Sequence, residues 1–99
     1  MENKMEIYKE KAQARYDRFN AKIDEFVARF NETKADAKLE MKNQFEDLTN
    51  QRRTVADKLD RMRNAGEDAW QEMRSGVDDA LDDLERTYQK TTQKLENAT

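Results

Sequence analysis

Apolar side chains recur along this chain at every third or fourth residue, from Met5 to Leu95. Twenty-six positions, joined by 25 steps, span these 90 residues, so the mean step is 3.6 residues. This is the period of an α-helix, whereas a half-buried strand would alternate apolar and polar side chains. The pattern therefore predicts an all-α protein built from long amphipathic helices.

The larger apolar side chains of this pattern form one continuous line, which we call the apolar stripe. Such a line is the packing face of an amphipathic helix. We predict that the stripe is the seam of an oligomer and consists of Phe19, Ile23, Phe26, Phe30, Leu48, Val55, Leu59, Met62, Trp70, Met73, Val77, Leu81, Leu84 and Tyr88.

Polar or small residues interrupt the apolar pattern at Lys34, Arg52, Gly66 and Thr92. Three of these positions lie in turn-like sequences, at residues 31–36, 49–54 and 64–67. Residues 64–66 are the strongest candidate for a helix break, because Asn64 and Gly66 are residues that commonly end helices. Breaks near residues 33 and 51 are less strongly indicated.

Against a break at 64–66, the apolar pattern crosses Gly66 without losing phase, and a glycine inside a helix costs only ~1 kcal/mol relative to alanine. An elongated coiled coil and a helical hairpin therefore both remain open, and residues 1–99 form a single coiled-coil region in either case. A single helix of this length would leave its stripe in water, and a hairpin of about 60 and 30 residues would leave half of the longer helix uncovered. We therefore expect a homo-oligomer.

Composition removes most kinds of chemistry. Charged residues make up 41% of the chain, and there is no histidine, cysteine or proline. Without histidine or cysteine, the common general base and the thiolate nucleophile are missing. Asp78 and Asp82 lie one helical turn apart and could hold a cation loosely, but charge runs on long helices are usually solvated faces. We predict no enzymatic activity, no cofactor, no metal and no small-molecule substrate.

Charge and hydropathy bear on the partners. Residues 1–54 carry 12 basic and 11 acidic side chains, and residues 55–99 carry 7 and 11. Neither half has the basic excess that binding to nucleic acid requires. No apolar run resembles a secretory signal or a membrane span, so we expect a cytoplasmic protein.

An 11-residue spacing, as in Leu48, Leu59, Trp70 and Leu81, also suits helices that lie on lipid. A membrane-surface protein is therefore the alternative function. The narrow stripe and the many carboxylates on the polar face weigh against it.

Residues 66–70, Gly-Glu-Asp-Ala-Trp, are followed by Met73, Gly76-Val77, Ala80-Leu81 and Leu84. This segment resembles the C-terminal signature of a family of small coiled-coil proteins of cyanobacteria and proteobacteria, often described as stress-response proteins. Glu67 is an insertion relative to that signature, and Met73-Arg74-Ser75 stands where Leu-Lys is usual. The 11-residue rhythm also resembles that of exchangeable apolipoproteins, which are punctuated by proline. The first resemblance implies a bacterial, self-associating structural protein with a stress-related role and no catalytic residues.

Overall fold

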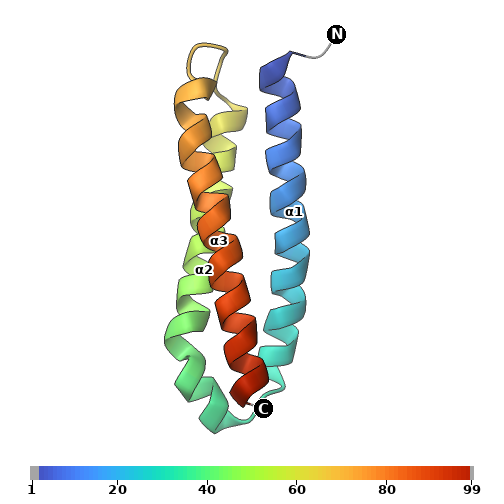
Figure 1. The fold of residues 1–99 in the computed structure, drawn as a ribbon, viewed down its shortest axis with the longest axis vertical. Coiled ribbons are helices and arrows are strands. Elements are labelled where there is room, and N and C mark those ends of the chain that lie inside the picture. Colours follow the sequence, from blue (N-terminus) through green and yellow to red (C-terminus); the bar gives the residue numbers. More distant parts are fainter. Residues whose placement is uncertain (1–2, 99) are drawn as a thin grey trace.

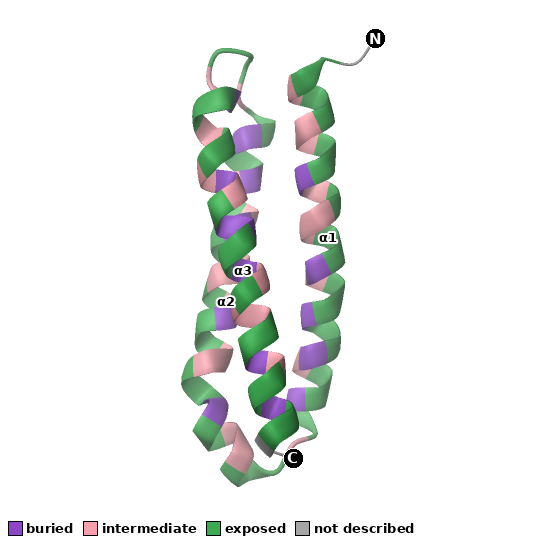
Figure 2. Cartoon of the chain, viewed as in Figure 1, coloured by how far each residue is buried: buried purple, intermediate pink, exposed green. Residues whose placement is uncertain are grey.

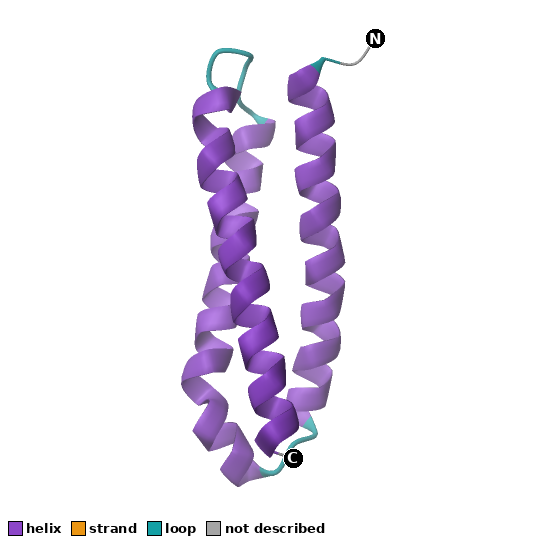
Figure 3. Cartoon of the chain, viewed as in Figure 1, coloured by secondary structure: helices purple, strands orange, loops and turns teal. Residues whose placement is uncertain are grey.

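The computed structural model describes residues 3–98, which form three α-helices: α1 (Lys4–Asn31), α2 (Ala35–Arg63) and α3 (Trp70–Ala98). Two short loops join the helices, and no strand occurs in this part of the chain (Figure 3). α1 and α3 run in one direction and α2 runs in the other, so the helices form an elongated bundle of 52 × 21 × 17 Å (Figure 1). The predictions of an all-α chain and of an elongated shape are confirmed.

The helix breaks differ in part from the prediction. α2 ends at Arg63 and α3 begins at Trp70, so the break near residues 64–66 is real and the uninterrupted helix is wrong. A second break, at residues 32–34, was the less strongly indicated one. Residues 49–54 lie inside α2, where the Thr54 hydroxyl donates to the Asn50 carbonyl (3.0 Å) as an ordinary helical side chain does.

The loop between α2 and α3 closes through main-chain hydrogen bonds. The amide of Ala65 donates to the Met62 carbonyl (3.1 Å), and the amides of Ala69 and Trp70 both donate to the Gly66 carbonyl (3.2 Å each). No described residue has a positive φ, so Gly66 is not required for a left-handed conformation. A Cβ atom on Gly66 would meet nothing within 4 Å. Its contribution to the turn is the carbonyl group.

The apolar stripe lies inside the bundle, where the buried faces of the three helices meet (Figure 2). Twelve of its fourteen residues are buried, and Met73 and Tyr88 are partly buried and pack against the core. The sequence analysis predicts that a second chain covers the stripe, because a hairpin of two unequal helices would leave half of the longer helix exposed to water. That reasoning is wrong because the break at 32–34 produces three helices of 28, 29 and 29 residues, which cover one another.

The interruptions of the apolar pattern lie at the edges of this core. Lys34 and Gly66 are exposed in the two loops, and Arg52 is half-buried. Near the end of α3, Thr91 is buried, whereas Thr92, which is one of the interruptions of the apolar pattern, is more exposed. On the outside of the described bundle, Ile7 and Leu39 are the exposed large hydrophobic side chains.

The three helices do not pack equally. α2 and α3 contact each other more extensively than α1 contacts either of them. Figure 1 shows α1 standing to one side of the α2–α3 hairpin. The fold is therefore a close antiparallel hairpin with a third helix laid against it.

Candidate functional site

The polar contacts that hold α1 against the hairpin are the most organised feature of the described residues. At one end of the bundle, the Tyr8 hydroxyl donates to Asp78 Oδ1 (2.6 Å) and also lies 3.1 Å from the Arg74 carbonyl. The Tyr8 ring lies 5.9 Å from the ring of Trp70, and the Arg74 guanidinium lies 5.0 Å from the Tyr8 ring centroid. We call these four residues the Tyr8 cluster. It joins the N-terminal parts of α1 and α3.

The phenol of the Tyr8 cluster is held in its protonated form. Burial raises the pKa of Tyr8 above its ordinary value, and the hydrogen bond to the Asp78 carboxylate raises the pKa further, because that bond needs the phenolic proton. A phenol in this state is a donor to a neighbouring carboxylate and is a poor proton acceptor at neutral pH. The cluster is therefore suited to joining helices, and its geometry does not arrange a general base.

Two turns further along α1, Arg15 binds two carboxylates of α3, Asp82 (2.7 Å) and Glu85 (2.9 Å). The hydrogen bond to Asp82 raises the pKa of Arg15, and the bond to Glu85 adds to the rise. Together with Asp78, which accepts from Tyr8, these acidic groups of α3 are used in contacts with α1. No group of three or more possible metal ligands comes together within the described residues.

α1 also contacts α2 through polar side chains. The Lys9 ammonium donates to the carbonyls of Ala65 (3.0 Å) and Arg63 (3.3 Å), at the C-terminus of α2. A cation is favoured there because the last carbonyls of a helix carry partial negative charge. Lower in the bundle, Arg52 forms an ion pair with Asp24 of α1 (2.9 Å).

The C-terminal half of α1 is held by aromatic rings. Phe30 stacks on Phe45 of α2, with ring centroids 4.4 Å apart and an interplanar angle of 11°. Phe19 meets Tyr88 of α3 edge to face at 6.2 Å. Such pairs contribute roughly 0.5–1.5 kcal/mol beyond the area they bury. α1 is therefore held by both polar contacts and ring contacts along its length.

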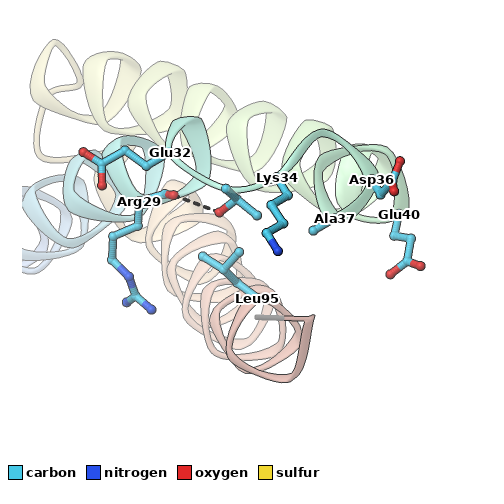
Figure 4. Close-up of a pocket in the computed structure, with 8 residues that line it drawn as sticks. Arg29, Glu32, Lys34, Asp36, Ala37, Glu40 and Leu95 are labelled. Carbon is cyan, nitrogen blue, oxygen red and sulfur yellow. Dashed lines mark hydrogen bonds between the residues drawn. The ribbon is translucent and has the colours of Figure 1, made fainter.

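A hollow of about 570 Å³ lies beside the α1–α2 loop. Its lining residues are Arg29, Glu32, Thr33, Lys34, Asp36, Ala37, Glu40 and Leu95. Figure 4 shows Lys34 extending toward Leu95, with Asp36 and Glu40 farther along α2 and the Thr33 hydroxyl donating to the Arg29 carbonyl (2.9 Å). Charges of both signs surround one large apolar side chain, so the hollow presents no consistent chemistry to a ligand.

The structure brings the predicted stripe residues together and also shows side-chain pairs between helices that the sequence analysis did not predict. Tyr8 and Asp78 are 70 positions apart, and Arg15 and Asp82 are 67 apart. No spacing within one helix points to such pairs. The one indication in the sequence was the acidic run at residues 78–85, because clustered carboxylates are stabilised by a nearby cation. Arg15 of α1 is such a cation.

Comparison with known protein families, with curated protein sequences and with solved structures finds no match to this chain. The resemblance based on residues 66–84 therefore stays a prediction. Within the described residues, no helix combines the length and the apolar character that crossing a membrane requires.

Proposed function

We propose that this chain is a non-enzymatic structural protein that acts by self-association of its amphipathic helices. The observation that carries the proposal is the phase of the apolar pattern. Phe30, Lys34, Ala37 and Met41 follow one another at steps of 4, 3 and 4 residues across the α1–α2 loop. The core faces of α1 and α2 would therefore stay on one side of an extended helix, which could pair with a second copy.

The polar groups support the same proposal. The side-chain contacts of Tyr8 with Asp78 and of Arg15 with Asp82 and Glu85 join one helix to another. A binding site for a substrate would leave such groups turned toward a cavity. Here these groups contact each other and fix the position of α1 relative to α3, as in a protein with a structural role.

The second candidate function is reversible binding to a lipid surface. α3 separates its apolar and polar side chains more sharply than α1 or α2 does, which favours this helix as a lipid face. Its polar face carries Asp79 and Asp83, however, which an anionic membrane would repel. If α3 binds a lipid surface, we therefore expect that surface to be uncharged.

The resemblance of residues 66–84 adds a setting to the proposal, namely a bacterial, cytoplasmic protein with a stress-related role. It brings no catalytic residue and no cofactor, in keeping with a structural function. The core positions of that segment are Trp70, Val77, Leu81 and Leu84, all of which are buried.

Sedimentation velocity and far-ultraviolet circular dichroism over a dilution series test the proposal. We expect dimers at near-millimolar concentration that dissociate on dilution into monomers of unchanged helicity, because each monomer buries its own stripe. A chain that stays monomeric throughout would contradict self-association. Vesicles of uncharged lipid and of anionic lipid are added in parallel, and co-sedimentation of the chain with the uncharged vesicles alone would favour the lipid function instead.

A further inference from the structure

The α1–α2 loop is short, and its first residue is helical. Glu32 has φ −86° and ψ −7°, within the right-handed helical region. Lys34 has φ −61°, which is a helical value, and departs from the helix through its ψ of 148°. The loop contains no glycine and no proline. A change in this three-residue loop that includes the ψ of Lys34 would therefore bring α1 and α2 toward one continuous helix.

Hydrogen bonding at the loop does not oppose this change. Lys34 is the N-cap of α2 and makes no side-chain hydrogen bond to the start of the helix. The closed loop is held by the amides of Glu32 and Thr33, which donate to the carbonyls of Arg29 (3.2 Å) and Phe30 (3.1 Å). In a continuous helix these amides would donate one residue farther back, and the first amides of α2 would gain main-chain acceptors that they now lack.

A continuous helix over residues 4–63 would be about 90 Å long at ~1.5 Å per residue. Its α1 part could no longer reach the hairpin of its own chain. It could, however, occupy the place of α1 on the hairpin of a second copy, where the contacts of Arg15 with Asp82 and Glu85 would form again between chains. Two copies that exchange α1 in this way bury the same core twice, which is why such exchange costs little.

The outer surface favours exchange over side-by-side association. Ile7 and Leu39 are the exposed large hydrophobic side chains of the described bundle, and they are 38% and 73% exposed. They lie toward opposite ends of the molecule, in the first turns of α1 and α2. A closed bundle therefore offers no broad apolar patch to a second closed bundle.

Lys34 opposes the open form. It is exposed in the closed bundle, yet it occupies a position of the apolar pattern between Phe30 and Ala37. In an exchanged dimer the two hinges would meet at the two-fold axis, and the two Lys34 ammonium groups would lie close together on the apolar faces. We propose that two copies of this chain exchange α1 about residues 32–34, and that Lys34 is the residue that holds the chain closed. This inference rests on the proposed self-association and supplies its geometry.

Two substitutions act on the two forms in opposite directions. Lys34→Leu removes the like charges and completes the stripe of the open form, so we expect the dissociation constant of the dimer to fall about tenfold or more. Ala35→Pro suits the closed form, because Ala35 is the first residue of α2 and Lys34 already has the extended ψ that precedes proline. Proline inside a continuous helix is strongly disfavoured, so this variant should stay monomeric. Lys42→Leu is the matched control, an exposed lysine of α2 that lies off the stripe.

A distance within one chain distinguishes exchange from any other dimer. The chain has no cysteine, so Arg18→Cys and Arg53→Cys provide two unique sites for spin labels on α1 and α2. In the closed bundle the two labels lie at a similar level, within the width of a bundle 21 × 17 Å across. In the open chain they are 35 residues apart on one helix, or about 53 Å. This distance is measured by electron–electron double resonance on labelled chains mixed with excess unlabelled protein. Because each labelled chain then pairs with an unlabelled one, only the distance between the two labels of the same chain is observed.

We expect the Lys34→Leu dimer to show the long distance, and Ala35→Pro and Lys42→Leu to keep the short one. A Lys34→Leu dimer with the short distance, or a Lys34→Leu chain that stays monomeric, would overturn the exchange. The unsubstituted chain separates the two proposals. If it dimerises with the short distance, self-association stands and exchange fails. If it never dimerises while Lys34→Leu exchanges, the hinge stands and the proposed function fails.

Discussion

Leu84→Ala tests whether one chain supplies the core. Leu84 is 0% exposed and lies in the middle of α3, within the buried cluster. Truncating a fully buried leucine removes its transfer free energy and leaves a cavity, which together cost about 3 kcal/mol in well-packed proteins. For a domain of this size, such a loss lowers the melting temperature by roughly 12–24 °C.

Leu39→Ala is the matched control, because it makes the same change in a helix at a position that is 73% exposed. Leucine and alanine are both good helix formers, so this variant should change the free energy of unfolding by no more than about 0.5 kcal/mol. The assay is urea unfolding followed by circular dichroism at micromolar concentration, with the slope m compared between variants. Equal losses in the two variants, or a loss under about 1 kcal/mol for Leu84→Ala, would refute the assignment of the stripe to the interior of the monomer.

Two further predictions concern polar groups. Tyr8→Phe removes the hydrogen bond to Asp78 and should cost about 1 kcal/mol at neutral pH. Because the pKa of Tyr8 is raised in the folded chain, its stabilising contribution is fully present below its ordinary pKa of 10.0 and is lost as the pH rises beyond that value, so the unfolding midpoints of the parent and Tyr8→Phe should converge in alkali. A constant difference between the two across that range would contradict this account. Thr91→Val should stabilise the chain by about 1 kcal/mol, because Thr91 is 1% exposed and its hydroxyl has no hydrogen-bond partner; a lower urea midpoint would show that the hydroxyl is satisfied.

The helical period and the interior residues could be predicted from the sequence, because burial of an amphipathic face leaves a repeating trace. The break at 64–66 left a trace as well, in Asn64 and Gly66. The break at 32–34 left little trace in the sequence. Lys34 has an extended ψ there, and because any residue can adopt this ψ, no glycine or proline is required. Because this break was given little weight, the sequence analysis assigned the covering of the stripe to a second chain, whereas the three helices of one chain cover it.

The contacts of α1 with the hairpin could not be predicted, for a different reason. Tyr8 meets Asp78, and Arg15 meets Asp82, because α1 and α3 are parallel and offset by about 70 residues along the chain. That offset is set by the lengths of two loops and by the packing of three helices. Periodicity places a residue on a face but says nothing about which residue of another helix lies opposite.

The two loops also explain why α1, and not α3, is the helix assigned to exchange. The apolar pattern keeps its phase across both loops, so phase alone does not choose between them. The α2–α3 loop is longer, running from Asn64 to Ala69, so more residues would have to change conformation to straighten it. The α2–α3 hairpin is also the closest helix pair of the bundle. The α1–α2 loop is only three residues long and its first residue is already helical, and α1 is held by contacts such as Arg15–Asp82 that water can replace. Opening at residues 32–34 therefore disturbs the least, and it leaves intact a hairpin that a second copy of α1 can bind.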